Sequence, residues 1–594
     1  MSRSRAASLS SETPQQQQHA DSFDDSATTA SRKLSDASTK DLPIEPVQRL
    51  KMGLQTPASA TVTSLNNLHA DPEKQGGVFA STSGYKGSGT SEDPYVVAWL
   101  QDERSPYKWS KAQKWTCTMV SGVSCLAVAF GSSVYAGAGR QLTSLFGLST
   151  ETFTLGLTLY VLGFACGPML WAPLSELFGR RPIFIVSYAP FVLFNIGCAT
   201  SQNIESLLVC RFFAGFFGSS PLTVAGGIIS DLFEASERSL AMGVFSTMPW
   251  LGPILGPIAG AFMGQSVSWR WIFWLLTAFS GVMFVLGGLV PETYSPVLLR
   301  RKAKRLTQET GQIHISMYDL NVDANETLFS KLKVNCSRPF VLLACEPIVL
   351  LFAIYTAVVY AELYMMFGAF PIVFSEGRGW SQGLAGLPFI GMGLGMLLAI
   401  GYNTFIINKK YVRDIQLNGG RPLAPEARLP ICCVGGILLP IGLFWFAWTV
   451  RPSIHWIVPC LAMIPFGLGQ VLLFLPMMNY MVDAYLIYAA SALAANAVIR
   501  SIAGAFLPLA TARMFHAMSS EWALTFLGFL ATILAPIPFL FLKYGARIRS
   551  KSRFAPGHRP ATAADSEVVN KEVEEADLAQ QEAERRSIAE QNRV

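Results

Sequence analysis

The feature that most constrains this chain is a series of long apolar runs between about residue 114 and residue 542. A helix that crosses the hydrocarbon core of a bilayer needs about 20 predominantly apolar residues. In lipid every backbone polar group needs a partner inside the protein, and a helix supplies one within a single segment. The sequence therefore predicts an all-α membrane protein with about twelve transmembrane helices, placed near 114–138, 152–172, 182–200, 204–229, 239–263, 271–290, 340–366, 384–407, 429–450, 454–478, 489–512 and 521–542.

Composition supports one membrane body rather than several soluble domains. The 594 residues are 51% hydrophobic and only 14% charged, whereas soluble proteins carry about a quarter of charged residues. The ten cysteines lie mostly in apolar stretches and form no CxxC pairs. We therefore interpret them as small hydrophobic residues and predict no disulfide framework and no metal site.

A polar loop divides the twelve runs into six and six, which predicts five parts. These are a disordered N-terminal tail (1–105), a six-helix bundle (106–290), a central loop (291–339), a second six-helix bundle (340–543) and a C-terminal tail (544–594). The first tail is rich in Ser, Thr, Gln and Asp and has no periodic apolar face, so it cannot offset the entropy cost of ordering. No secretory signal is visible at the N-terminus.

Lysine and arginine predict the orientation. They gather in the central loop, in the loop near 409–428 and after the second run, while the alternate loops carry single residues such as Arg140 and Arg270. Loops rich in Lys and Arg stay on the cytosolic side of a membrane. We therefore expect the central loop and both tails to face the cytosol.

The turn between the second and third runs reads WAPLSELFGRRPIF. It resembles motif A of the major facilitator superfamily, Gly-x-Leu-x-Asp-x-x-Gly-Arg-Arg/Lys, with Ala172 in place of the first Gly and Glu176 in place of the Asp. Gly179 permits a tight turn, and arginines at helix ends near carboxylates suit a latch between moving halves. An ordinary basic turn is the alternative. The residues that fill the motif are Leu174, Glu176, Gly179, Arg180 and Arg181.

The fourth run holds an arginine, Arg211, within LLVCRFFAGFFGSS. An arginine in the middle of a membrane helix costs about 2.5–3.5 kcal/mol on insertion scales, so it usually faces a cavity or a partner. Its position matches the arginine of motif B, which the resemblance links to proton coupling. A structural arginine that extends to the membrane surface is the alternative.

The fifth run contains WLGPILGPIAGAF at 250–262. Gly252, Gly256 and Gly260 recur every four residues and present a smooth face to a neighbouring helix. Pro253 and Pro257 remove backbone donors, which a membrane bundle tolerates because neighbouring helices and local adjustments compensate. The stretch resembles motif C of drug/proton antiporters, and this resemblance implies export. A kinked packing helix without that role is the alternative.

Further blocks resemble the fungal twelve-spanner drug:H⁺ antiporter family, from PYKWSKAQKW (106–115) and PETYSPVLLRRKAKRL (291–306) to FLKYGARIRSKSRFAP (541–556). The resemblance covers about residues 106–556. It implies the major facilitator fold, with two six-helix bundles around a central path, and it includes polyamine transporters as well as multidrug or metabolite efflux pumps.

The chain contains no G-x-x-x-x-G-K-[ST] loop for ATP, so we expect the proton gradient to drive transport without a bound cofactor. Glu362 stands out because it lies in an apolar run beside Tyr360 and Tyr364, and a carboxyl group removed from water takes up a proton more readily. An acid wetted by the mouth of a cavity is the alternative. The candidates for proton coupling are Arg211, Glu346, Glu362, Asp483 and Arg500.

We therefore expect proton-coupled efflux of hydrophobic or amphipathic small molecules, either toxic compounds or secreted metabolites such as a glycolipid or an organic acid. A polyamine:H⁺ antiporter is the alternative, although few acids lie well inside the runs. A sensor, an uptake symporter or a membrane enzyme would be other classes, and six scattered histidines argue against the enzyme. The expected partners are a small-molecule substrate and the bilayer, with no nucleic acid. We expect a monomer in the plasma membrane, with the vacuolar membrane as the other possibility.

Overall fold

The computed structural model describes residues 85, 87, 89, 90, 93–99, 105–233, 235–319, 328–418, 423–485, 488–552 and 554. Most residues of both predicted tails lie outside the described residues. The prediction that the tails are disordered concerns those residues. The described residues all belong to one compact unit, Ser64–Val594.

The first half of the chain forms six helical runs. The first run consists of three consecutive elements, α4, η2 and α5, and the fourth consists of two, α8 and α9. The elements are α4 (Lys111–Ser133), η2 (Val134–Ala138), α5 (Gly139–Phe146), α6 (Thr150–Phe178), α7 (Arg180–Thr200), α8 (Ile204–Gly218), α9 (Ser220–Leu232), α10 (Ala235–Ser266) and α11 (Arg270–Leu289).

The central loop and the second half follow, with a short strand in the loop that pairs with one before α4. The elements are β1 (Tyr95–Val97), η1 (Pro106–Lys108), α12 (Ser295–Thr310), β2 (His314–Ser316), α13 (Leu328–Cys345), α14 (Pro347–Phe370), η3 (Pro371–Glu376), α15 (Gln382–Ala385), α16 (Phe389–Tyr402), η4 (Asn403–Ile407), α17 (Asn408–Leu417), η5 (Pro425–Arg428), α18 (Leu429–Thr449), α19 (Ile457–Tyr485), α20 (Ala489–Phe506), η7 (Leu507–Ala510), α21 (Thr511–Leu534) and α22 (Pro536–Ser550).

Ten helical stretches in the described part are long and apolar enough to cross a membrane. The longest, Ala489–Ser550, is interrupted at Met518 and Ser519, whose backbone angles are not helical, so it covers two of the predicted runs. The remaining predicted run corresponds to α10, a helix of 32 residues. The predicted all-α membrane fold is confirmed.

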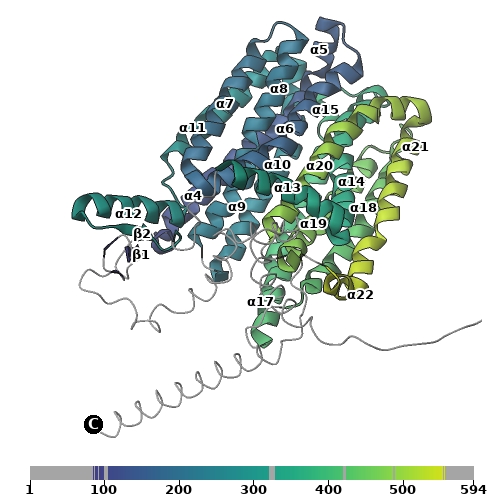
Figure 1. Cartoon of the computed structure of the whole chain (residues 1–594). Coiled ribbons are helices and arrows are strands. Elements are labelled where there is room, and N and C mark those ends of the chain that lie inside the picture. Colours follow the sequence, from purple (N-terminus) through teal and green to yellow (C-terminus); the bar gives the residue numbers. More distant parts are fainter. Residues whose placement is uncertain are drawn as a thin grey trace, which may run out of the picture. The chain divides into compact units, whose positions relative to one another are not determined.

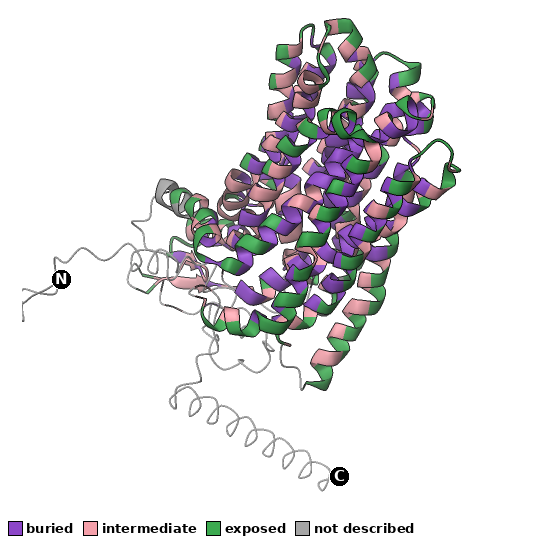
Figure 2. Cartoon of the chain, turned by 90° about the vertical axis from the view of Figure 1, so that its right-hand side faces the viewer, coloured by how far each residue is buried: buried purple, intermediate pink, exposed green. Residues whose placement is uncertain are grey.

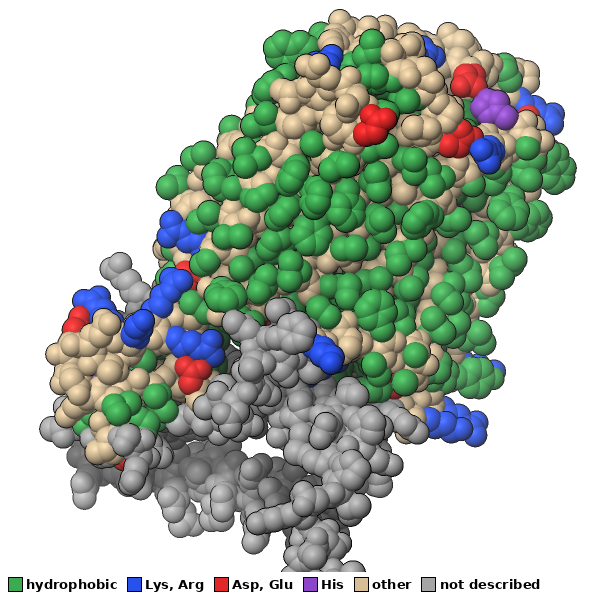
Figure 3. All heavy atoms as spheres, turned by 45° about the horizontal axis from the view of Figure 1, so that its top comes forward, with side chains coloured by type: hydrophobic (Ala, Val, Ile, Leu, Met, Phe, Trp, Pro, Cys, Tyr) green, Lys and Arg blue, Asp and Glu red, His purple; other side chains and the backbone are tan. Residues whose placement is uncertain are grey.

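The two halves pack side by side, and their lipid-facing surface is apolar. Buried residues lie on the inner sides of the helices and exposed residues on the outer sides (Figure 2). Many exposed side chains are large and hydrophobic, as expected for a surface that faces lipid rather than water. Charged side chains gather toward the two ends of the bundle (Figure 3). We call the end with α12, α17 and α22 the loop end and the end with α5 and α15 the far end (Figure 1).

A small folded platform at the loop end corrects the predicted tail boundary at 105. Strand β1 pairs in parallel with β2, with Tyr95 opposite His314 and Val97 opposite Ser316. Val97 is fully buried and packs with Leu299 and Ala303 of α12. Sequence reasoning missed this because a strand of three residues carries no clear periodicity, and its partner lies more than 200 residues away.

The predicted C-terminal boundary also shifts. Helix α22 runs to Ser550 rather than ending before 544. Arg549 in its last turn forms an ion pair with Glu426, with 3.0 Å between Nη2 and Oε2. Both side chains are largely buried, so the first residues of the predicted tail are part of the folded bundle.

Candidate functional site

Helix α10 lies between the halves, and its glycine face meets the first transmembrane run. A Cβ atom added at Gly252 would strike Ala129, one at Gly256 would strike Ser133, and one at Gly260 would strike the Val134 carbonyl. Close approach of this kind is what glycines at four-residue spacing permit. The seam continues to Gly264, which meets Gly137 and which sequence reasoning did not include.

The other side of α10 packs against the second half. Ile254 fills the space beside Gly393 of α16, and Ala261 lies beside Gly386 near α15. The helix remains continuous although it contains Pro249 as well as Pro253 and Pro257, and the last two are buried. A helix held on both sides in this way moves only if its contacts with one half are broken.

Arg211 is fully buried at the middle of the first half. Its Nε donates to the Gly156 carbonyl (3.0 Å), Nη1 to the Gly131 carbonyl (2.7 Å) and Nη2 to the Ser132 carbonyl (3.3 Å). The guanidinium carbon also lies 4.7 Å and 4.2 Å from the ring centroids of Tyr135 and Tyr160. Cation–π contacts and neutral carbonyls stabilise the cation. No carboxylate in the described part forms a salt bridge with it.

A chain of hydrogen bonds runs from Arg211 across to the second half. Ser132, whose carbonyl accepts from Arg211, has its Oγ 3.0 Å from the Tyr364 hydroxyl on α14. The Tyr360 hydroxyl donates to that of Tyr364 at 3.1 Å. The guanidinium of Arg500 on α20 lies 4.8 Å from the Tyr360 ring centroid. The two predicted arginines are therefore linked across the boundary between the halves by hydrogen bonds and one cation–π contact.

Glu362 lies on a different face of α14 from this network. Residues at i and i+2 point about 200° apart on a helix, so Glu362 faces away from Tyr360 and Tyr364. It shares its face with Tyr355, whose hydroxyl lies close to Gly436 of α18. Only 1% of Glu362 is exposed, which excludes the alternative of an acid wetted at a cavity mouth in this conformation. Neither carboxylate oxygen has a hydrogen-bond partner among the described residues.

Glu346 and Asp483 lie at the loop end, apart from the mid-membrane residues. Glu346 occupies the break between α13 and α14 and accepts a 3.0 Å hydrogen bond from the Tyr485 hydroxyl. Asp483 pairs with Arg428, with 2.9 Å between Oδ2 and Nε. The structure therefore does not bring the five predicted coupling residues into one cluster.

The motif A turn is organised around Glu292, which sequence reasoning did not select. Gly179 has φ of 103°, and a Cβ there would strike the Glu292 carboxylate. That carboxylate accepts the backbone N–H groups of Arg180 (2.9 Å) and Arg181 (3.2 Å) at the start of α7. It thereby satisfies donors that a helix N-terminus leaves unpaired.

The arginine side chains of the turn bind different partners. Arg180 pairs with Asp231 at 3.2 Å between Nε and Oδ2, and it also donates to Ser175. Arg181 donates to the Gly288 carbonyl through Nε and Nη2. Near this turn, burial raises the pKa of the Tyr318 hydroxyl to about 12.

Glu176 and Leu174 occupy the last turns of α6, at the boundary with the second half. Glu176 lies within electrostatic range of Arg180 in its own half and of Arg338 on α13. The Cys336 thiol of α13 also contacts the Met169 carbonyl at 3.5 Å. An acid placed between cations of both halves fits the predicted latch; Leu174 is half-buried and makes no polar contact.

The far end joins the halves through several polar contacts. These are Arg140 Nη2 to Ser375 Oγ (2.5 Å), Gln382 Nε2 to the Gly137 carbonyl (2.7 Å), Gly383 N–H to Gln265 Oε1 (2.8 Å) and Arg513 Nε to Glu151 Oε1 (2.8 Å). None of these residues was selected from the sequence. Single polar residues in short loops give no signal of a partner that lies hundreds of residues away.

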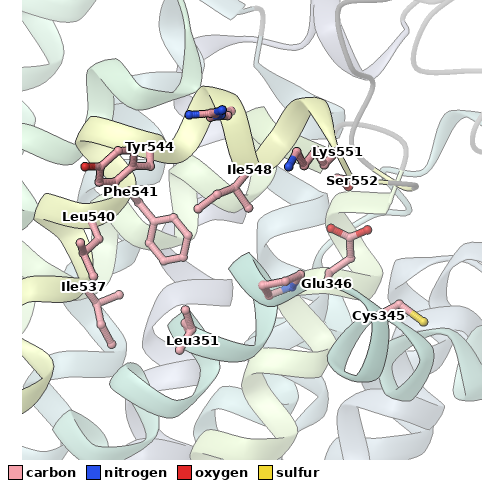
Figure 4. Close-up of a pocket in the computed structure, with 12 residues that line it drawn as sticks. Cys345, Glu346, Leu351, Ile537, Leu540, Phe541, Tyr544, Ile548, Lys551 and Ser552 are labelled. Carbon is pink, nitrogen blue, oxygen red and sulfur yellow. The ribbon is translucent and has the colours of Figure 1, made fainter.

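A groove of about 790 Å³ opens at the loop end between α14 and α22. Figure 4 shows Glu346 on one wall and Ile548 and Lys551 on the other. The groove is lined by the second half alone, and none of the mid-membrane arginines or tyrosines contributes to it. We therefore place the candidate site between the halves and not in this groove.

Two helical halves that meet along a proline-containing helix, with a buried polar network across their boundary, are the arrangement of a secondary membrane transporter. The family model of the Major Facilitator Superfamily matches residues 121–508, and the chain belongs to this family. It is 51% identical over 473 residues to "Major facilitator superfamily multidrug transporter mdrA" of Aspergillus fumigatus, covering 79% of this chain and 77% of that protein. It is 49% identical over 474 residues to "MFS-type efflux pump MFS2" of Trichophyton rubrum, covering 79% of each chain.

A solved structure shows the same fold. The proton:xylose symporter XylE, bound to 6-bromo-6-deoxy-D-glucose, aligns with a TM-score of 0.55 at 16% sequence identity. The alignment covers 73% of this chain and 96% of XylE. At this identity the likeness concerns the fold alone.

Proposed function

We propose that this chain exports hydrophobic or amphipathic small molecules from the cytosol and that proton entry drives the export. The observation that carries the proposal is the α10 seam. Its glycines from Gly252 to Gly264 meet α4 and η2 with no room for a side chain, up to the far end. Packing this close leaves no room for water between α10 and the first run, which supports a role of the seam in preventing a proton leak. The relatives at about 50% identity are named as a multidrug transporter and an efflux pump.

Glu362 is our proposed proton carrier. An ionised carboxylate without a partner is costly in an apolar interior, and Glu362 has no described hydrogen-bond partner. Glu362 can therefore lose its proton only if the packing around this part of α14 changes at the same time. Because Tyr360 and Tyr364 lie on the same helix and join the network to Arg211, movement of α14 would transmit protonation to the interface between the halves.

The test compares accumulation of the neutral amphipathic dye Nile red in cells that lack the chain and in cells that overproduce it. We expect lower dye content in the overproducing cells and loss of this difference when an uncoupler is added. Gly256→Val is the inactive control, verified at the membrane by an epitope tag. Equal dye content in both cell types, or a difference that survives the uncoupler, would refute proton-driven export.

A further inference from the structure

Inside the membrane-spanning helices, away from their ends, positive side chains outnumber negative ones among the described residues. The described acidic residues of the transmembrane helices lie near helix ends, with Glu362 as the exception, and Glu362 faces away from the interface. Two arginines lie inside the membrane-spanning helices, Arg211 on α8 of the first half and Arg500 on α20 of the second. Neither arginine forms an ion pair with a described carboxylate, so the interior of the helical body carries positive charge that no described acid neutralises.

Of the two arginines, Arg500 has N–H donors that no described residue accepts. The Arg211 guanidinium donates to three backbone carbonyls. Arg500 is half-buried, its Nε is buried without a partner, and it makes no hydrogen bond or ion pair with any residue that the structure describes. A guanidinium has five N–H donors in a fork that matches a carboxylate.

Aromatic rings surround Arg500 and complete what we call the arginine box: Arg500, Tyr360, Phe474 and Trp250. The guanidinium carbon lies 4.8 Å from the Tyr360 ring centroid and 5.0 Å from that of Phe474. Phe474 in turn meets Trp250 of α10 edge to face, with 5.3 Å between centroids. The box thus draws on α10, α14, α19 and α20 and bridges both halves.

We propose that the arginine box binds the carboxylate of an amphipathic organic acid, so that aromatic monocarboxylates are preferred substrates of the export proposed above. The cation would hold the carboxylate, and the rings would contact the apolar part of the same molecule. A polyamine would meet like charge at Arg500, which has no ion-pair partner among the described residues. The inference rests on the proposed function, but its test does not depend on the dye assay.

The test uses three probes with the same ring system: 2-naphthoate, neutral 2-naphthamide and cationic 2-naphthylmethylammonium. Their binding to the purified full-length protein is measured by equilibrium dialysis. We expect 2-naphthoate to bind at least about 10-fold more tightly than 2-naphthylmethylammonium, with the affinity of the amide between the two. Equal affinities, or tighter binding of the cation, would overturn the inference, and the second result would favour the polyamine alternative.

Variants locate the preference. Arg500→Gln should weaken 2-naphthoate binding about 10-fold and leave 2-naphthamide nearly unchanged, while Arg500→Lys should restore part of the loss. Arg305→Gln is the matched control, because Arg305 is exposed on α12 and pairs with Glu309 one turn away. Unchanged 2-naphthoate binding by Arg500→Gln would overturn the assignment. The charge preference of the unmodified protein decides the inference even if a variant fails to fold, and the dye assay separately decides the proposed function.

Discussion

Replacement of Glu292 tests whether the motif A turn is held by one carboxylate. Glu292 is 6% exposed and accepts four backbone N–H groups. Two come from the start of α7, and two come from Thr293 and Tyr294 that follow it in the chain. Glu292→Ala would leave all four donors without this acceptor, and Glu292→Gln would keep one oxygen and lose the charge.

The magnitude follows from what such contacts contribute. Loss of a helix N-cap costs about 0.5–2 kcal/mol, and hydrogen bonds to a charged group contribute about 1.5–3 kcal/mol each without adding fully. We therefore expect Glu292→Ala to lower the unfolding free energy by about 2–4 kcal/mol and Glu292→Gln by about half of that. For a unit the size of the first half, 1 kcal/mol shifts Tm by about 2–4 °C, so the alanine variant should melt roughly 4–16 °C lower.

Thermal unfolding of the purified protein, followed by tryptophan fluorescence, measures the difference. Glu205→Ala is the control, because Glu205 is an exposed acid in the first turn of α8, which Asn203 already caps. We expect that control to change stability by less than about 0.5 kcal/mol. If Glu292→Ala melted at the same temperature as Glu205→Ala, the carboxylate would not hold the turn and the reasoning would be wrong.

Three further predictions concern α10, α14 and the platform. Gly256→Ala should reduce dye export and lower stability by about 1–3 kcal/mol through overpacking against Ser133. Gly281→Ala, where the added Cβ meets nothing within 4 Å, should match the unmodified protein. Equal export by both variants would contradict the proposed role of the glycine seam. Glu362→Gln should abolish the uncoupler-sensitive part of export without loss of the folded protein. The control Glu376→Gln, at an exposed acid near His516, should export normally. Full export by Glu362→Gln would exclude Glu362 as the proton carrier. Val97→Asp should speed tryptic cleavage within α12 about 10-fold, because it buries a charge in the platform. Val96→Asp, on the other face of β1, should not change the cleavage rate. Equal cleavage rates for the two variants would show that β1 does not protect α12.

The helices could be predicted from the sequence because each is specified by its own residues. A run of 20 apolar residues has few alternatives to a membrane helix, and the structure retains this pattern. The seventh run was misplaced at its start, 340 rather than 347, because apolar residues continue through the break at Glu346. The platform could not be predicted, since its strands are short and pair across the whole first half.

The site was only partly predictable. Motif residues such as Gly179 and Gly256 were identified because their spacing is local, and their neighbours in the structure explain that spacing. Glu362 was predicted beside Tyr360 and Tyr364, but a step of two residues turns it to the opposite side of α14. Glu292 and the far-end contacts depend on pairings across long sequence distances, which a single sequence does not reveal.

The platform also ties the central loop to the start of the first half. Most of the central loop of 291–339 is folded as α12, β2 and α13, and α12 and β2 pack with the strand that precedes the first crossing. Val97 is buried against Leu299 and Ala303, so α12 is fixed to the segment that leads into the first crossing. When the halves rock, α12 and β2 would therefore travel with the first half as one cytosolic flange.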